Sequence, residues 1–320
     1  MKKALAAVMA ASLVVLGFTG CDKKANDNSQ KKIKIGVTQF VEHSALDANY
    51  KGFVDGLKEA GYVNKKNIII DYQNAQGEQA NCVTIAQKLI NENNDLIFAI
   101  ATPAAQAVAN LTTDTPILVS SVTDPASAKL VNSNEMPGTN VSGTSDLTPC
   151  AAQMELLKKL FPEAKTVGML YCSNEQNSYF QIALAEKACK ELGLKYIEAT
   201  VSNSNELQQV TQSLCSKVDV IYCPTDNMMA AGMSLVSQVA AENGKAVICG
   251  EEGMVKNGGF ATYGINYYEL GKQTAQMAVE IIEGRAEPAT MPIQYVNTCV
   301  FKYNEERAQQ LGITIPEDLK

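Results

Sequence analysis

The sequence predicts an α/β protein of two similar lobes, each a parallel sheet flanked by helices, joined by a three-segment hinge. Strand and helix patterns alternate along most of the 320 residues, which is typical of parallel sheets covered by helices. The pattern restarts after "GTNVSGTSD", and one phrase is written twice: "DLIFAIATPAAQ" begins at Asp95 and "DVIYCPTDNMMA" begins at Asp219. A repeated order of elements implies two lobes of similar design.

Periodicity identifies the elements one by one, because apolar residues at helical spacing predict helices and short apolar runs between turn residues predict strands. The strands predicted for the first half are 32–40, 67–75, 95–100 and 116–122, and the helices are 44–62, 77–93 and 102–111. The strands predicted for the second half are 165–172, 195–201, 219–223 and 245–250, and the helices are 149–162, 177–194, 205–216 and 227–244.

The hinge is expected where the chain passes between the lobes, near 142–146, 265–268 and 284–288. The helix predicted over 267–284 then returns to the first lobe. These crossings divide the chain into an N-terminal lobe, 33–145 plus 268–286, and a C-terminal lobe, 146–267 plus 287–320.

The first residues are those of an export signal. Two lysines precede the apolar run "ALAAVMAASLVVLGF", which is too short to span a membrane, so residues 1–20 are predicted to be a signal peptide. The run ends in "FTGC", and a small residue directly before Cys21 is similar to the lipobox of bacterial lipoproteins. We therefore expect Cys21 to carry a lipid and residues 21–32 to form a flexible tether. The predicted location is extracytoplasmic, with the membrane reached only through the lipid anchor.

Composition excludes several function classes. Removing Lys2 and Lys3 with the signal leaves 25 basic against 34 acidic residues. The remaining chain is acidic, so it lacks the excess positive charge that is typical of nucleic-acid-binding proteins. The sequence has no C-x-x-C, no phosphate-binding glycine loop and a single histidine, His43. Neither a metal site, nor a cofactor site, nor a Cys/His catalytic pair is predicted, and the protein is expected not to be an enzyme.

The candidate site lies where the strands end. In open parallel sheets ligands bind beyond the carboxyl ends of the strands, so two facing lobes bring those ends to one cleft. Hydroxyls and helix N-termini there suit an anion, and clustered carboxylates suit a cation, which together describe a zwitterion. The candidate ligand-binding residues are Thr38, Phe40, Glu42, Thr102, Ala104, Ala105, Thr123, Asp124, Asp146, Ser173, Asn174, Glu175, Tyr179, Asp226, Asn227, Glu251 and Glu252.

A family resemblance rests on the motifs at these ends. "TQFVEHSALD", "ATPAAQA", "VTDPASA", "GTSD", "PTDN" and "GEEG", in this order, resemble the ABC-transporter solute-binding lipoproteins of the tryptophan/tyrosine type, and more distantly the branched-chain amino-acid binders. The resemblance implies a type I periplasmic-binding-protein fold that closes on an amino acid, with an ABC permease and its ATPase as partners. It also implies roles for individual residues: Thr102 with the amides of Ala104 and Ala105 for the carboxylate, Thr123 for orientation, and Asp226, Glu251 or Glu252 for the ammonium.

The expected ligand is an aromatic L-amino acid, Trp, Tyr or Phe, bound by a monomer. The resemblance carries most of this expectation, and Phe40 and Tyr179 stand at strand ends of the two lobes where a flat ring could stack. A binder of a sugar or another small polar solute on the same fold is one alternative. A racemase-like enzyme that uses two of Cys172, Cys223 and Cys249 is another, although no base accompanies these thiols.

Overall fold

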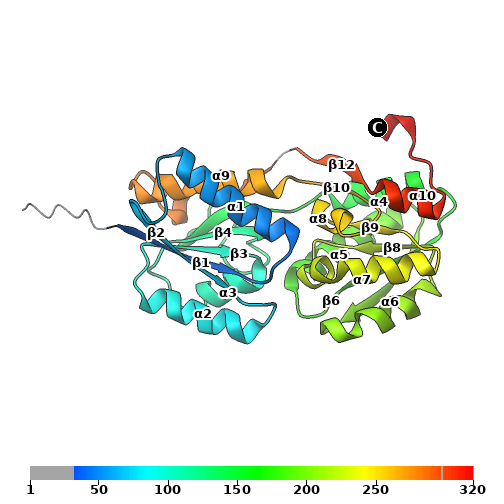
Figure 1. The fold of residues 1–320 in the computed structure, drawn as a ribbon, viewed down its shortest axis with the longest axis horizontal. Coiled ribbons are helices and arrows are strands. Elements are labelled where there is room, and N and C mark those ends of the chain that lie inside the picture. Colours follow the sequence, from blue (N-terminus) through cyan, green and yellow to red (C-terminus); the bar gives the residue numbers. More distant parts are fainter. Residues whose placement is uncertain (1–31, 297, 320) are drawn as a thin grey trace, which may run out of the picture. The chain divides into compact units, whose positions relative to one another are not determined.

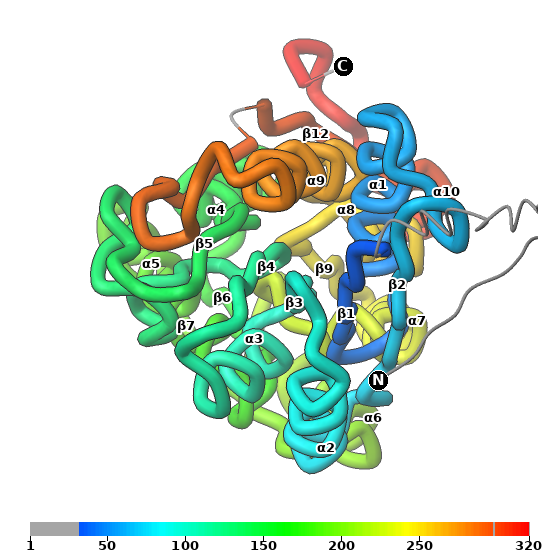
Figure 2. Tube along the Cα trace, turned by 90° about the vertical axis from the view of Figure 1, so that its left-hand side faces the viewer, coloured from blue at the N-terminus to red at the C-terminus, as the bar shows by residue number. Residues whose placement is uncertain are grey.

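The first lobe is built on a parallel sheet with the strand order β11-β5-β4-β3-β1-β2 (Figure 1). The computed structural model describes residues 32–296 and 298–319. The strands of this sheet are β1 (Ile33–Gln39), β2 (Ile68–Asn74), β3 (Leu96–Ile100), β4 (Ile117–Val122), β5 (Val141–Ser145) and β11 (Gln294–Tyr295). The helices are α1 (Ser44–Glu59), α2 (Gln79–Asn91), α3 (Thr102–Ala109) and α9 (Tyr267–Ile282). In Figure 2, α1 and α9 cover one face of this sheet, and α2 and α3 cover the other.

The second lobe repeats this plan with the order β12-β10-β9-β8-β6-β7, in which only β12 runs antiparallel to its neighbour. Its strands are β6 (Thr166–Cys172), β7 (Lys195–Val201), β8 (Val220–Cys223), β9 (Val247–Cys249), β10 (Ala261–Gly264) and β12 (Val300–Tyr303). Its helices are α4 (Cys150–Leu160), α5 (Gln176–Glu191), α6 (Leu207–Cys215), α7 (Asn227–Glu242), α8 (Glu252–Lys256) and α10 (Glu305–Leu311). Three short 3-10 segments complete the described chain: η1 (Ser204–Glu206), η2 (Pro288–Thr290) and η3 (Glu317–Leu319). The predicted fold class is confirmed.

Alternation of side chains along β6 shows why this sheet needs helices on both faces. Val167 and Met169 belong to the core cluster that contains Met154 of α4, whereas Leu170 belongs to the cluster that contains Leu207. Successive residues of a strand point to opposite faces, and every one of these apolar side chains is buried. A strand that is apolar on both faces is stable only between two layers of helices, which leaves its polar carboxyl end open for a ligand.

The helix α9 is held in the first lobe by close packing against α1. A Cβ atom at Gly271 would lie 2.0 Å from the carbonyl oxygen of Asn49, and one at Gly52 would lie 2.0 Å from that of Tyr268. Only glycine allows backbones to approach this closely. The chain segment that follows the second crossing is thereby fixed to the first lobe.

Three segments connect the lobes, and both lobes belong to one compact unit that begins at Lys32. The chain crosses between β5 and α4, between β10 and α9, and between β11 and β12. The third crossing differs from the prediction: β11 pairs with β5 in the first sheet, so the chain crosses between Tyr295 and Val300, and not at 284–288. The prediction that 287–295 belongs to the C-terminal lobe is wrong, because a two-residue edge strand has almost no periodicity to read.

Candidate functional site

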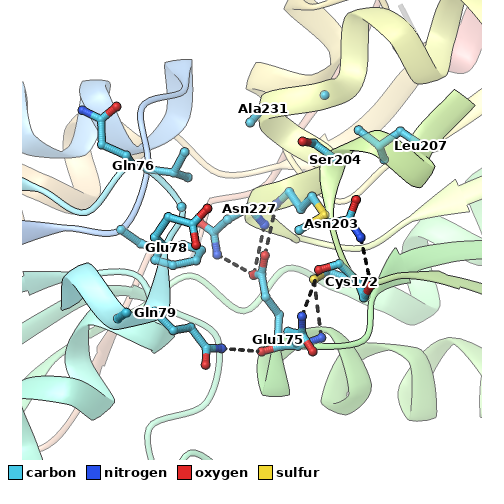
Figure 3. A pocket seen from close by; sticks show the side chains of 18 residues that line it. Gln76, Glu78, Gln79, Cys172, Glu175, Asn203, Ser204, Leu207, Asn227 and Ala231 are labelled. Carbon is cyan, nitrogen blue, oxygen red and sulfur yellow. Dashed lines mark hydrogen bonds between the residues drawn. The ribbon is translucent and has the colours of Figure 1, made fainter. Parts of the chain in front are cut away.

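Two neighbouring cavities lie where the strand ends of the two lobes meet. The larger, which we call the outer cavity, has a volume of about 510 Å³ and is shown in Figure 3. Its lining comes from both lobes: Phe40, Val41, Gln76, Gly77, Glu78, Gln79, Ala80, Cys172, Asn174, Glu175, Ser202, Asn203, Ser204, Leu207, Asn227, Met228, Ala231 and Gly232. Pockets of about 300 to 1,000 Å³ are the usual size of small-molecule sites.

The smaller cavity, which we call the inner chamber, has a volume of about 10 Å³, roughly that of a single water. It is lined by His43, Leu46, Ser121, Thr123, Asp146, Asn177, Thr225, Asp226, Asn227, Ala230, Glu251 and Tyr267. Asn227 lines both cavities, and its Oδ1 lies 3.3 Å from Nε2 of His43 in the other lobe. This contact between the lobes therefore stands where the two cavities adjoin.

Three buried carboxylates line the inner chamber, and its described lining contains no Lys or Arg. Asp146 accepts a hydrogen bond from the Tyr267 hydroxyl at 2.8 Å. Burial raises the pKa of Asp146 to about 6, against the opposing effect of the hydrogen bond from Tyr267. Burial raises the pKa of Glu251 to about 7, with a further increase from the nearby charge of Asp146. The electrostatics of the chamber favour a cation.

Two of these three carboxylates already serve as helix caps. Asp226 caps α7, accepting from the amide of Met229 at 2.8 Å, the amide of Cys172 at 2.7 Å and the hydroxyl of Ser178 at 2.6 Å. Glu251 caps α8 and accepts from the amides of Gly253 and Met254. Their oxygens are occupied by the protein itself, as is expected of an N-cap.

Glu175, which lines the outer cavity, also binds the start of α7. It accepts from the amides of Asn227 and Met228 at 3.1 and 3.0 Å, and from Nδ2 of Asn227 at 2.6 Å. Burial, together with the neighbouring charge of Asp226, raises the pKa of Glu175 to about 8. This side chain fixes the amide orientation of Asn227, whose Oδ1 is then directed to His43.

Three hydrogen-bond acceptors on residues that line the chamber have no partner among the described residues: Oδ1 of Asp146, Oδ1 of Asn177 and Nδ1 of His43. The imidazole is assigned as a donor from Nε2 because Oδ1 of Asn227 can only accept, which leaves Nδ1 as an acceptor. Burial lowers the pKa of His43 to about 4, so the ring is neutral at physiological pH. A ligand group that fits here must be small, cationic and a donor of several N–H bonds.

Several candidate residues from the sequence do line these cavities. Four of them line the outer cavity, namely Phe40, Asn174, Glu175 and Asn227. Five line the inner chamber, namely Thr123, Asp146, Asp226, Asn227 and Glu251.

The structure brings the remaining candidates to neither cavity: Thr38, Glu42, Thr102, Ala104, Ala105, Asp124, Ser173, Tyr179 and Glu252. Asp124 instead accepts from the amide of Ser127 and from Nδ2 of Asn134, which orders its own loop. The Tyr179 side chain is 48% exposed and packs edge-on against Tyr171. It points outward because the preceding Ser178 occupies the inward position on α5, where it binds Asp226.

Other lining residues were missed from the sequence. Gln76–Ala80 and Ser202–Ser204 follow β2 and β7, the equivalent strands of the two lobes. The signal was present, since both repeats carry an Asn-rich turn at this point. Thr225 lies in the motif "PTDN" beside the candidates Asp226 and Asn227, and only Asn177 gave no signal, because a single polar residue at a helix start reads as a cap.

The raised carboxyl pKa values predict how the stability of the ligand-free protein depends on pH. Asp146, Glu251 and Glu175 bind protons more tightly when folded, at pKa values of about 6, 7 and 8, than when unfolded. The folded state therefore holds extra protons up to about pH 8, and the lowered pKa of His43 opposes this only below about pH 6.5. The free energy of unfolding should fall as pH rises, most clearly from about pH 6.5 to 8. Urea unfolding at a series of pH values measures this, and Asp146→Asn should reduce the slope. Stability that increases with pH over this range would contradict the assignment.

A protein with two α/β lobes and a polar cleft between their strand ends is one that binds a small solute. The chain belongs to the family described as ABC transporter substrate binding protein, whose model matches residues 34–320. It is 40% identical to the "Tyrosine-binding protein" of Clostridioides difficile (strain R20291), over 98% of this chain and 93% of that protein. The family predicted from the motifs is confirmed.

Two solved structures bear on the arrangement of the lobes. The ABC domain in complex with L-Trp from Streptococcus pneumoniae has a TM-score of 0.87 at 40% identity, covering 90% of this chain and 97% of that one. A ligand-free, open structure of a substrate binding protein with adhesive properties from Clostridium difficile has a TM-score of 0.69 at 44% identity, covering 89% and 97%. Because hinge motion lowers whole-chain similarity and leaves each lobe unchanged, the lobes here are arranged more as in the L-Trp complex.

Proposed function

We propose that this chain captures an aromatic L-amino acid between its lobes and delivers it to an ABC permease driven by its ATPase. The observation that carries the proposal is the set of unpaired acceptors on Asp146, Asn177 and His43 at a chamber with three carboxylates and no cationic side chain in its described lining. An ammonium group carries one positive charge and three N–H donors, and it is about the size of a water. The inner chamber suits this group and no larger part of a ligand.

Among the carboxylates, Asp146 is the proposed partner of the ammonium. Asp226 and Glu251 are occupied as helix caps, whereas Oδ1 of Asp146 is buried and unpaired. Asp226 and Glu251 then act through space by keeping the chamber negative. Thr123, whose hydroxyl also receives a hydrogen bond from Gln181 at 3.3 Å, orients the ligand.

The outer cavity is the proposed place of the aromatic side chain. It adjoins the chamber at Asn227, and Phe40, Leu207 and Met228 give it apolar walls. An aromatic ring buries a large apolar surface and stacks favourably on another ring, which here is supplied by Phe40. The names of the relatives, a tyrosine-binding protein and a complex with L-Trp, support an aromatic side chain.

The two alternatives receive less support from the site. A sugar would leave the charge of the inner chamber unbalanced, since it has no cationic group to offer. A racemase would need a reactive thiolate, but Cys172, Cys223 and Cys249 are buried, and burial raises the pKa of Cys172 to about 12. We propose that the protein is a monomeric binding protein without catalytic activity, and incubation with L-tyrosine should produce no D-isomer by chiral chromatography.

The protein is proposed to be extracytoplasmic and anchored to the cell membrane through a lipid on Cys21. This residue and the predicted signal peptide lie outside the described residues, and none of the helices from Lys32 onward that the structure describes is long and apolar enough to cross a membrane. Growing cells with a fatty-acid probe should label the wild-type protein, and Cys21→Ser should abolish the label. Equal labelling of both would refute the anchor.

The proposed ligand class is tested by heating the protein with each of the twenty amino acids. A ligand that binds only the folded state raises the melting temperature in proportion to the logarithm of its concentration over Kd. Trp, Tyr or Phe should give the largest increase. An increase in melting temperature with Leu alone would reject the proposal, and so would the absence of an increase with any amino acid.

A further inference from the structure

Two glutamines join the lobes by direct hydrogen bonds that lie outside both cavities. Gln176, at the start of α5 in the second lobe, donates from Nε2 to the carbonyl oxygen of Ser127 in the first lobe at 2.5 Å. Its Oε1 accepts from Nε2 of Gln106 of α3, in the first lobe, at 2.8 Å. Nε2 of Gln106 also donates to the carbonyl oxygen of Ala128 at 3.1 Å. We call Gln106, Gln176, Ser127 and Ala128 the latch.

The hydrogen bonds of the latch match the capacity of the two side chains. An amide group has two N–H donors, and Gln106 uses one within its own lobe and the other across the cleft. Gln176 bonds to the first lobe through both its nitrogen and its oxygen. The bond to Ala128 therefore orients Gln106 within the first lobe, and Gln176 can complete the network only when the lobes close.

None of the four latch residues lines the outer cavity or the inner chamber. A ligand in either cavity does not contact the latch residues. The latch therefore affects the arrangement of the lobes and not the contacts of the ligand. The contact between His43 and Asn227 differs in this respect, because both of those residues line the inner chamber.

We propose that the latch is a positioning device, centred on Gln176, that holds the closed arrangement and slows the release of ligand without touching it. This inference rests on the proposed function for the identity of the ligand used in its test. The binding-competent closed form is favoured by contacts made only in that form, and loss of such contacts weakens apparent affinity by the change in its population. Because ligand enters while the lobes are apart, the latch should affect dissociation and not slow association.

The test is stopped-flow binding of L-tryptophan to wild type and Gln176→Ala. The chain contains no Trp, so ligand fluorescence excited beyond tyrosine absorption reports binding without a protein background. We expect the dissociation rate constant of Gln176→Ala to rise about tenfold, equivalent to about 1.4 kcal/mol, and the association rate constant not to fall. Gln106→Ala in the Gln176→Ala background should add little, because both changes remove the same bond.

The matched control is Gln238→Ala, an exposed glutamine whose amide bonds within its own helix to Glu242. It should leave both rate constants unchanged. A dissociation rate constant for Gln176→Ala within about twofold of the wild-type value would overturn the latch.

Failure of the wild-type protein to bind any aromatic amino acid would count against the proposed function and not against the latch. In that case small-angle X-ray scattering of the ligand-free proteins decides. A larger radius of gyration for Gln176→Ala than for wild type supports the latch, and equal radii reject it.

Discussion

Replacing Asp146 with Asn should weaken the binding of L-tyrosine by roughly two to four orders of magnitude, or ~3 to 5 kcal/mol. The substitution keeps the shape of the side chain and an oxygen that can still accept from the Tyr267 hydroxyl. It removes the negative charge at the one chamber carboxylate with an unpaired buried oxygen. An ammonium group would then be buried without its charge partner, which is the costly event in a buried ion pair.

The stability of the ligand-free variant should not fall with its affinity. Burial raises the pKa of Asp146 to about 6, so its ionised form is disfavoured in the empty protein and a neutral amide is tolerated there. Glu252→Gln is the matched control, because this carboxylate follows Glu251 in the sequence but lines neither cavity. Isothermal titration calorimetry beside urea unfolding separates the two effects. Unchanged affinity in Asp146→Asn would remove Asp146 from the site.

Replacing Asp226 with Ala should instead reduce stability, by about 3 kcal/mol, and lower the melting temperature by roughly 6 to 12 °C. The carboxylate caps α7 through Met229 and also accepts from the amide of Cys172 and the hydroxyl of Ser178. Loss of a cap costs about 1 kcal/mol, and the buried donors of Cys172 and Ser178 would be left without a partner.

Affinity for L-tyrosine should fall by less than about tenfold in Asp226→Ala, since its oxygens are occupied by the protein. Asn304→Ala is a useful comparison, because Asn304 caps the short α10 through a single amide, that of Arg307 at 2.9 Å. It should cost only about 1 kcal/mol. A stable Asp226→Ala protein that has lost binding by several orders of magnitude would identify Asp226 as the ammonium partner instead.

The alternation of elements could be predicted from the sequence because each strand and helix carries its own periodic pattern. The segments "DLIFAI" and "DVIYC" contain β3 and β8, which occupy equivalent positions in the two sheets. What could not be read was β11, where two residues pair with β5 only because the tertiary structure places them there. The third crossing was therefore placed too early in the chain.

The candidate site was predictable as a region and not as a set of contacts. Strand ends are visible in the sequence, so Phe40, Thr123, Asp146 and Glu251 were all named. Whether a carboxylate is free to bind a ligand or caps a helix depends on the helix that follows it. Asp226 and Glu251 cap helices, whereas Asp146 keeps an unpaired oxygen. The rotation of α5 could not be read either, and it turns Tyr179 to solvent.

The central claim is that an aromatic amino acid binds between the lobes with its ammonium group at Asp146. Calorimetric titration with L-tyrosine, its deaminated analogue hydroxyphenylpropionate, L-leucine and ribose tests this claim most directly. We expect tight binding of L-tyrosine, much weaker binding of L-leucine, and no detectable binding of ribose or of the analogue that lacks the amino group. Tight binding of ribose or L-leucine without L-tyrosine, or equal binding of L-tyrosine and its deaminated analogue, would contradict the account.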